Sequence, residues 1–383
     1  MIASPADGPS HVLVFNAGSS SLKLSVVAAD GAVADSYDID RWNGRADAPA
    51  LRDYLERLAG AKDPPVRAIG HRVVHGGSRY ISATLIDNEV RAGIAELTSL
   101  APLHQPRARA GMDAATAAFP GLPQVACFDT AFHATMPPQA YTYALPATWR
   151  ELFGLRKFGF HGLSHSYASR RAAELVSPID RNKFRVVTCH LGAGSSLAAV
   201  QGGRSVDTTM GFTPVDGLVM ATRCGSLDPG MLTWLASEGR IGVPELTTGL
   251  EHASGLAGLT GGSGDIREVS AAAQAGDPSA ELALGVYAHR LVTLIAAMAA
   301  AMNGLDALAF TGGIGEHHAT VRAAAAAGLG FLGVAVDRER NTAAHADADI
   351  SADGAAVRTL VLTAREDAEV ARSTFEVMRA VSS

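Results

Sequence analysis

Two short segments rich in glycine and serine, one in each half of the chain, could hold an anion. NAGSSS at residues 16–21 lies between the runs VLVF and LKLSVV, and LGAGSS at 191–196 lies between RVVTCH and LAAVQGG. A turn between two strands can present several backbone N–H groups to phosphate oxygens, although a single such turn is most simply a plain hairpin. Neither segment has the form G-x-x-x-x-G-K-[ST], and a strand rather than a helix is expected after each, so neither is a P-loop.

Charged residues in apolar surroundings form a second group of candidates. Arg72 in HRVVHGG and Arg223 in ATRCGSLDP lie in apolar, glycine-rich sequence, where an unpaired charge would be costly. A guanidinium group grips carboxylate or phosphate oxygens with two parallel donors, so we expect both arginines to bind anions. Asp129 follows the run QVACF, either as a plain turn residue or as a carboxylate directed into a site.

The histidines of GFHGLSH allow a metal interpretation that the spacing does not favour. His161 and His165 would share one face if the segment were helical. The zinc protease motif also needs a glutamate after the first histidine, and Gly162 stands there. A zinc pair is therefore the weaker alternative.

The elements that must position these residues alternate between strands and helices. We expect helices at 108–118, 164–176 and 280–303, the last of them buried, and a surface helix at 319–330. A third glycine-rich turn, FTGGIGEH at 310–317, follows the strand ALAF. This alternation predicts an α/β architecture, and the two strand–turn–strand units indicate an internal repeat.

Composition narrows the class of protein. The chain has 383 residues, 48% of them apolar and 18% charged, with a formal net charge of -6. That length suits two domains, and the absence of a basic run argues against nucleic acid as a partner. An anionic ligand would have to be attracted by local arginines, because the overall field is negative.

Compartment and membrane association can also be predicted. The longest apolar run, at 291–302, is about a dozen residues and too short to cross a bilayer. The first eleven residues contain no apolar stretch, so we expect no secretory leader. The three cysteines, Cys127, Cys189 and Cys224, lack metal-type spacing and should pack inertly. We expect a cytoplasmic protein that binds no membrane.

Several motifs, taken in order, resemble those of the acetate kinase family, which includes propionate and butyrate kinases. They are NAGSSSLK (16–23), HRVVHGG (71–77), APLHQP (101–106), FDTAFHATMP (128–137), KFGFHGLSH (157–165) and GFTPVDGLVMATRCGSLDP (211–229). The resemblance runs from His11 to about Arg372. It implies the duplicated actin-like fold of acetate and sugar kinases, Hsp70 and actin, with two α/β domains flanking a cleft. The implied domains are 1–135 plus 364–383, with a returning C-terminal helix, and 136–363, which would bind nucleotide and form a homodimer.

The resemblance also implies reversible phosphoryl transfer between ATP and acetate, with Mg²⁺ (or Mn²⁺) as the metal ion. It assigns catalysis to Arg72, His104, Asp129, His161 and Arg223, the acyl pocket to Val74, Leu103, Phe160 and Pro214, and the metal to Asn16 and Glu366. Nucleotide binding would fall on Asn16, Ser19, Ser21, Lys23, His190, Gly192, Gly194, Asp265, Ile266, Arg267, Gly313 and Ile314.

Three departures from the family pattern concern the nucleotide side. Ala193, His317 and Gln105 each stand where the family usually has asparagine. Three alternatives to an acetate kinase follow from the sequence: a propionate kinase of the same fold, a nucleotide-binding scaffold that lost catalysis, and a metal hydrolase built on HGLSH. The joint presence of Arg72, Asp129, His161 and Arg223 argues against the scaffold.

Overall fold

The computed structural model describes residues 11–18, 21–61, 65–345 and 347–382. Internal contacts divide the described residues into two compact units. Unit 1 comprises those of Met1–Ala134, His161–Tyr167 and Arg365–Ser383, and unit 2 those of Thr135–Phe160 and Ala168–Ala364. The domain boundaries expected from the sequence stay a prediction; they did not foresee that His161–Tyr167 groups with unit 1. The prediction that the chain has no secretory leader concerns its first eleven residues, and residues 1–10 lie outside the described ranges.

Unit 1 is built on one mixed sheet with the strand order β3-β2-β1-β4-β6-β5. The strands are β1 (His11–Ala17), β2 (Leu22–Ala28), β3 (Val33–Ile39), β4 (Val66–Val73), β5 (Thr84–Leu85) and β6 (Gln124–Phe128). β1 to β3 form an antiparallel meander, whereas β4 runs parallel to both β1 and β6. The first glycine-serine segment is therefore the β1–β2 hairpin, as the sequence predicts.

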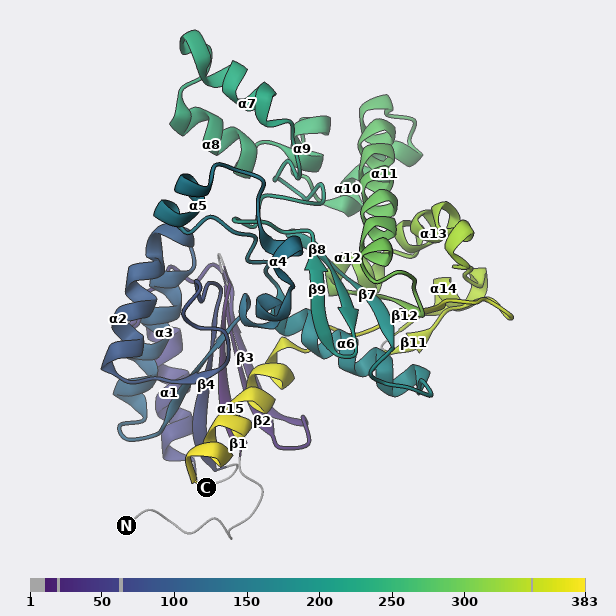
Figure 1. Cartoon of the computed structure of the whole chain (residues 1–383). Coiled ribbons are helices and arrows are strands. Elements are labelled where there is room, and N and C mark those ends of the chain that lie inside the picture. The colour runs from purple at the N-terminus through teal and green to yellow at the C-terminus, as the bar shows by residue number, and fades with distance from the viewer. Residues whose placement is uncertain (1–10, 19–20, 62–64, 346, 383) are drawn as a thin grey trace. The chain divides into compact units, whose positions relative to one another are not determined.

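Helices cover both faces of this sheet because the apolar residues of β1 point alternately to the two sides. Leu13 and Phe15 belong to the cluster formed with the helices α1 and α3, and Val12 and Val14 to the cluster formed with α15. Figure 1 shows α15 lying along β1 and β4. The helices of this unit are α1 (Pro49–Gly60), α2 (Asn88–Glu96), η1 (Leu97–Leu100), α3 (Gln105–Ala118) and α15 (Glu366–Ser382).

Unit 2 repeats the sheet of unit 1. Its strand order is β11-β12-β10-β7-β8-β9. Each strand has a counterpart in unit 1: β7, β8 and β9 correspond to β1, β2 and β3, and β10, β12 and β11 correspond to β4, β6 and β5. Neighbouring strands are parallel or antiparallel as their counterparts are. The strands are β7 (Arg185–Leu191), β8 (Ser195–Gln201), β9 (Arg204–Thr208), β10 (Ala307–Thr311), β11 (Ala348–Asp349) and β12 (Arg358–Val361). The internal repeat expected from the two glycine-serine turns is confirmed.

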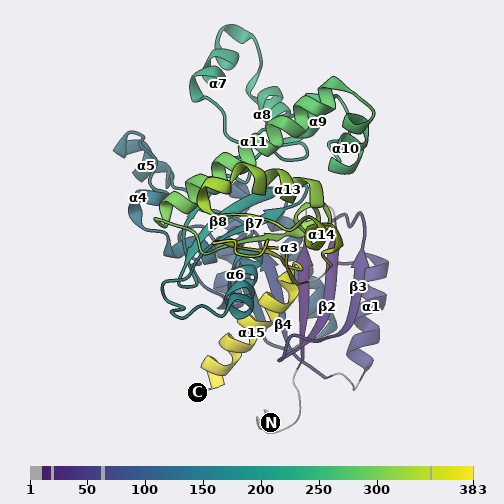
Figure 2. The same cartoon turned by 90° about the vertical axis from the view of Figure 1, so that its right-hand side faces the viewer.

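The helices of unit 2 pack around this second sheet; α11 lies against β7 and β8, and α13 lies against α11 (Figure 2). They are α4 (Pro138–Tyr141), α5 (Ala147–Phe153), α7 (Pro229–Ala236), η3 (Ser237–Gly239), α8 (Val243–His252), α9 (Gly255–Thr260), α10 (Ile266–Gln274), α11 (Pro278–Ala301), α12 (Gly312–His317), α13 (Ala319–Gly328), η4 (Gly330–Leu332) and α14 (Arg338–Ala343). Two elements cross the division of the chain: η2 (Ala131–Thr135) and α6 (Gly162–Val176).

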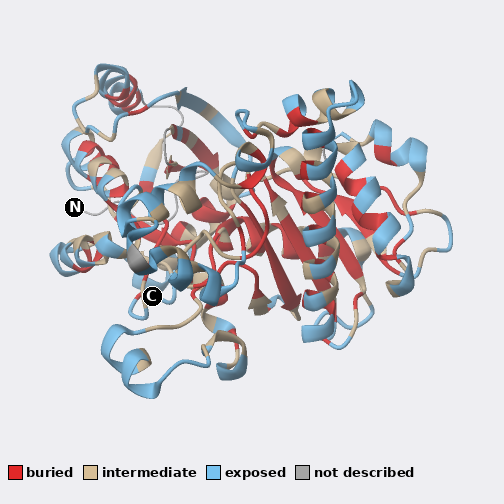
Figure 3. Ribbon diagram, turned by 90° about the horizontal axis from the view of Figure 1, so that it is seen from above, coloured by how far each residue is buried: buried red, intermediate tan, exposed pale blue. Residues whose placement is uncertain are grey.

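Two expectations about these elements need correction. α11 is buried only along one face, which carries Tyr287, Leu291 and Ile295, and its other side is exposed (Figure 3). By length and composition alone it also passes the test for a membrane-spanning helix, yet its buried face belongs to the core of unit 2. The third glycine-rich turn is the short helix α12. The expected surface helix is α13, which is exposed along one side and buries Val321 and Arg322 on the other.

Candidate active site

The ends of three neighbouring strands place a cluster of polar side chains in unit 1. The last pair in the parallel register of β1 and β4 is Phe15 with His71, so Asn16 and Arg72 follow next to each other. Arg72 is also opposite Cys127 of β6, which puts Asp129 just beyond the end of that strand. Parallel strands end at the same sheet edge, which is where α/β proteins commonly bind ligands.

Arg72 lies at the centre of this cluster. Its Nη2 donates to Oδ2 of Asp129 at 2.8 Å and its Nη1 to Oδ1 of Asn16 at 3.0 Å. The same Nη1 forms an ion pair with Oε2 of Glu366 at 3.2 Å, and this oxygen accepts a hydrogen bond, 2.8 Å long, from Nδ2 of Asn16. The side chain of Asp129 is 1% exposed and that of Arg72 13%. Four predicted residues from four distant segments of the chain thus lie in one connected cluster.

The charges in this cluster do not balance, because two carboxylates face one guanidinium group. Burial raises the pKa of Asp129, and the negative charge of Glu366 raises it as well. Arg72 lowers this pKa, but by less, so the pKa of Asp129 lies above its ordinary value. Burial lowers the pKa of Arg72, but Asp129 and Glu366 raise it by more. The excess negative charge and the oxygen atoms of Asn16, Asp129 and Glu366 match what Mg²⁺ requires of its ligands. These residues therefore fit a magnesium ion.

His161 joins the cluster through its backbone. Its N–H donates to the carboxylate of Asp129, and its φ of 54° is in the left-handed region. The next residue, Gly162, passes so close to Asp129 that a Cβ atom there would lie 2.0 Å from the Asp129 carbonyl oxygen. Only glycine allows this approach, so the position of His161 depends on its neighbour. His161 directly precedes α6, and its carbonyl oxygen accepts the N–H of His165.

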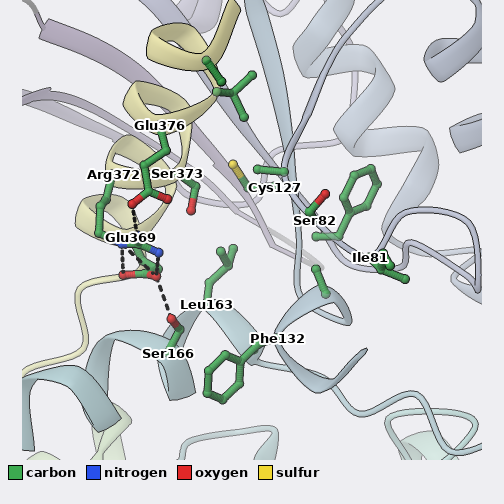
Figure 4. A pocket seen from close by; sticks show the side chains of 16 residues that line it. Ile81, Ser82, Cys127, Phe132, Leu163, Ser166, Glu369, Arg372, Ser373 and Glu376 are labelled. Carbon is green, nitrogen blue, oxygen red and sulfur yellow. Dashed lines mark hydrogen bonds and ion pairs between the residues drawn. The ribbon is translucent and has the colours of Figure 1, made fainter. Parts of the chain in front are cut away.

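A cavity of about 380 Å³ lies beside this cluster in unit 1 but carries none of the predicted site residues. Its walls include Phe128 and Gly162, which adjoin Asp129 and His161. Figure 4 shows Glu369 of α15 accepting hydrogen bonds from Ser166 of α6 and from Arg372. This buried carboxylate holds α15 against the start of α6, a role that the sequence did not reveal.

The other predicted residues of unit 1 are less constrained. His104 precedes α3 and is half-buried, Val74 is buried, and Leu103 is 48% exposed. Lys23 is exposed on β2 opposite Asn16 in the β1–β2 register. Ser21 closes the first hairpin, where its carbonyl oxygen accepts the N–H of Gly18. The prediction for Ser19 lies outside the described residues.

Arg223 is the most informative predicted residue of unit 2. Its Nη1 donates to the carbonyl oxygen of Pro214 at 3.4 Å, which links two residues predicted for the substrate. In the described part of the chain no carboxylate lies within ion-pair distance of Arg223. Burial lowers its pKa, and Glu251 raises it by less. A half-buried guanidinium group without a carboxylate can bind an anionic ligand. Phe160, also predicted for the acyl pocket, is buried.

The predicted nucleotide residues of unit 2 differ in what they can offer. In the second hairpin the N–H of Gly192 bonds to the carbonyl oxygen of Gly194, so this donor closes the turn and does not serve a phosphate. His190 is half-buried near the end of β7. Asp265 caps α10 and pairs with Arg267.

Two apolar predictions of the nucleotide site also find their places in unit 2. Ile266 is 5% exposed within the core, so a nucleotide contact could come only from its backbone. Gly313 is exposed on α12, and the neighbouring Ile314 packs against the core.

Sequence reasoning missed Arg322 and Glu316, which lie around α12. Arg322 is 1% exposed and donates to the carbonyl oxygens of Gly315 and Glu316 and to both oxygens of Asn341. Burial lowers its pKa. The carboxylate of Glu316 accepts two backbone N–H groups. The alanine-rich sequence around Arg322 gave no signal of such contacts.

Comparisons with known proteins agree with this geometry. The model of the acetokinase family matches residues 40–372. The acetate kinase of Shouchella clausii is 42% identical over 392 residues, which cover 96% of this chain and 99% of that protein. The acetate kinase of Gloeobacter violaceus is 49% identical over 315 residues, covering 82% of this chain and 77% of that protein.

Solved structures give the same result. The crystal structure of Porphyromonas gingivalis acetate kinase aligns with a TM-score of 0.88 and 34% identity, covering 96% of this chain and all of that one. A propionate kinase from Francisella tularensis aligns with a TM-score of 0.86 and 35% identity, covering 96% and 99%. The predicted resemblance and the duplicated actin-like fold are thereby confirmed. Because the family model matches most of its length and such relatives align with it almost throughout, this chain belongs to the acetokinase family.

Proposed function

We propose that this chain catalyses reversible transfer of the terminal phosphoryl group of ATP to acetate, giving acetyl phosphate and ADP. The match to acetate kinases over 96% of the chain carries the proposal. In the forward direction a carboxylate oxygen of acetate attacks the γ-phosphorus, and the bond from that phosphorus to the β–γ bridging oxygen breaks. ADP leaves with the bridging oxygen. Acetate is already ionised at neutral pH, so no general base is needed.

In this reaction the acetate carboxylate must approach the negatively charged phosphates of ATP. Cationic residues would reduce the repulsion between these two anions. Arg72 and Arg223 would grip the carboxylate and the phosphoryl oxygens with their paired donors. The imidazole of His161 would stabilise charge on the phosphoryl group in the transition state, and His104 would support it. No covalent intermediate on the enzyme is needed, because direct in-line transfer only requires positioning and charge stabilisation.

Asp129 and Asn16 would act by holding Arg72. The three contacts of Asp129 with this guanidinium group orient its fork, and Asn16 bonds to both Arg72 and Glu366. A magnesium ion would be held by Asn16 and Glu366, with Mn²⁺ as a substitute. When bound, it would neutralise phosphate oxygens of ATP. The contact geometry of the cluster supports this assignment.

The residues proposed for the nucleotide belong to two sets, one in the first hairpin and one in unit 2. Ser19, Ser21 and Lys23 together with His190, Gly192 and Gly194 are the proposed phosphate residues. Asp265, Ile266, Arg267, Gly313 and Ile314 are proposed for the adenosine. The N–H of Gly192 is already bonded within the turn, which leaves this residue a steric role, and the core position of Ile266 leaves it only a backbone contact.

The acyl pocket is proposed to consist of Val74, Leu103, Phe160 and Pro214. A propionate kinase is the second candidate, because the Francisella tularensis propionate kinase aligns as well as an acetate kinase does. The two activities differ by one methylene group, which changes binding in an apolar pocket by about 1–3 kcal/mol.

We also propose a cytoplasmic homodimer that binds neither membranes nor nucleic acids. The dimer would form through unit 2, where Met231, Trp234 and Val243 of α7 and α8 are exposed. Light scattering after size exclusion would show twice the mass of the 39.5 kDa chain. A monomer at micromolar concentration would contradict this.

A hydroxylamine trap tests the proposed activity. The chain is mixed with ATP, magnesium and either acetate or propionate, and acyl phosphate is captured as a coloured hydroxamate. Colour that depends on the acid supports the kinase and ranks the two acids by kcat/KM. Nucleotide binding without colour, where a control kinase gives colour, would support a scaffold that lost catalysis. Hydrolysis that is lost with a chelator and restored only by zinc would support the metal hydrolase.

A further inference from the structure

We infer that Glu316 is a positioning residue whose carboxylate fastens α12 to the backbone segment that leads into α15. Oε1 of Glu316 accepts the N–H of Gly312, at the start of α12, at 3.1 Å and the N–H of Ala364 at 3.0 Å. Both donors are backbone groups on the same acceptor atom. One side chain therefore ties together segments that lie about fifty residues apart in sequence.

The start of α12 lies closely against the end of the β7 strand. Gly312 has a φ of 78°, and a Cβ atom there would lie 2.8 Å from the carbonyl oxygen of Leu191. Leu191 directly precedes the glycine-rich turn of the second hairpin. The helix that Glu316 ties to Ala364 thus begins next to the proposed phosphate hairpin.

The far end of α12 is held by Arg322. Its Nη1 donates to the carbonyl oxygens of Gly315 and Glu316 at 2.9 and 2.8 Å, and its remaining donors bind Asn341. In the part of the chain that the structure describes, no carboxylate pairs with this buried cation. The guanidinium group therefore serves as a fixed fork for backbone oxygens, and it keeps Glu316 in place.

The segment that Glu316 holds has a special place in the chain. It follows β12, and Leu362 still pairs with Phe310 through its N–H. The N–H of Thr363 then bonds to Oδ1 of Asp347 at 3.0 Å, and that of Ala364 to Glu316. Two successive amides are thus each held by a carboxylate, just before the chain passes from unit 2 to unit 1 at Arg365. Glu366, the proposed magnesium residue, is two residues beyond Ala364.

This arrangement implies that Glu316 fixes the position of α12 relative to the segment around Ala364. The inference rests on the proposed function for one consequence only, that α12 contacts the nucleotide. Loss of the tie should then weaken MgATP binding and leave acetate binding unchanged. The two hydrogen bonds from backbone N–H groups to Glu316, which we call the tie, can be measured by amide exchange without any enzyme assay.

Four variants separate the tie from other roles of a carboxylate. Glu316→Gln keeps an acceptor oxygen at the same reach without the charge, whereas Glu316→Asp keeps the charge but is one methylene shorter. Glu316→Ala removes both. Glu339→Ala is the matched control, because Glu339 is exposed on α14 and forms no side-chain hydrogen bond or ion pair with the residues that the structure describes. Amide hydrogen exchange of Gly312 and Ala364 is followed by NMR or by mass spectrometry of short peptides, and KM is measured for MgATP and for acetate.

The expected pattern follows the reach of the side chain and not its charge. Glu316→Asp and Glu316→Ala should speed exchange at Ala364 at least about tenfold and raise the KM for MgATP by about tenfold, since a hydrogen bond to a charged acceptor is lost. Glu316→Gln should stay within about threefold of the native chain in both, and Glu339→Ala should change neither. If Glu316→Ala does not fold, Glu316→Gln and Glu316→Asp still decide.

Two results would overturn the inference: a Glu316→Gln variant as impaired as Glu316→Asp, or native exchange rates at Ala364 in Glu316→Asp. Absence of acyl phosphate formation in the native chain would instead refute the proposed function. The exchange measurement would then still report on the tie.

Discussion

Replacing Arg72 with alanine should lower the stability of unit 1. A second substitution that neutralises Asp129 should restore much of the lost stability. The carboxylate of Asp129 is 1% exposed and makes three hydrogen bonds to Arg72. Removing one partner of a buried ion pair leaves an uncompensated charge, which costs about 3–5 kcal/mol. In the double variant Arg72→Ala/Asp129→Asn that charge is absent, so most of this cost should disappear.

The same reasoning gives the sign of the pH dependence. Burial already holds the pKa of Asp129 above its ordinary range, and Arg72 is the main group that lowers it. Without Arg72 this pKa rises further, so between the ordinary value of about 4 and the raised value the folded state binds more protons than the unfolded state. Stability of Arg72→Ala should therefore fall as pH rises through this window, and the deficit relative to the native chain should widen. The double variant should lose this dependence.

Trp42 provides a local probe for the measurement. It is 2% exposed in the core of unit 1, whereas Trp149 and Trp234 lie in unit 2 and are 54% and 58% exposed. In a background with Trp149→Phe and Trp234→Phe, the shift of Trp42 emission in urea reports unfolding of unit 1. An unchanged urea midpoint in Arg72→Ala, or no recovery in the double variant, would refute the reasoning. Acyl phosphate formation should fall by about 10²–10³ in both variants, because one electrostatic donor is lost.

Three further changes test other parts of the site. Arg223→Ala should lower kcat/KM by about 10²–10³ but shift unfolding by less than about 1 kcal/mol, because no carboxylate depends on it; a large loss of stability would contradict this. Gly162→Ala should lower kcat by at least about 10², since its Cβ would displace Asp129 and its neighbour, and Gly60→Ala, which meets no atom within 4 Å, is the control; equal kcat values would sink the argument. Glu366→Gln should raise the Mg²⁺ concentration needed for half-maximal rate in a titration at constant ATP, and an unchanged requirement would count against its role as a ligand.

Sequence patterns predicted the parts of the fold that depend on local order. The β1–β2 and β7–β8 hairpins followed from apolar runs around glycine and serine, and their repetition anticipated two sheets of the same topology. Asp129 was placed at the end of a strand because QVACF is a short apolar run, and the structure puts Arg72 beside it. The family motifs supplied the roles of these residues, which their spacing alone left open.

Contacts between distant segments could not be predicted in the same way. Arg322 lies in an alanine-rich helix, and its partner Asn341 is nineteen residues later in an unremarkable polar stretch. The helix α12 was expected as a turn because its glycines are common in turns, yet a carboxylate and a guanidinium group hold it in helical form. α11 is apolar on most sides, so periodicity gave no warning that one side is exposed.

The discontinuity of unit 1 has a consequence for synthesis on the ribosome. Its sheet is translated early, but α15 emerges only after the whole of unit 2. Until then the face of β1 that carries Val12 and Val14 lacks the covering residues Val370 and Ala371. A nascent chain therefore leaves this apolar strand surface uncovered by α15 until translation is nearly finished, whereas all of unit 2 has been made by then.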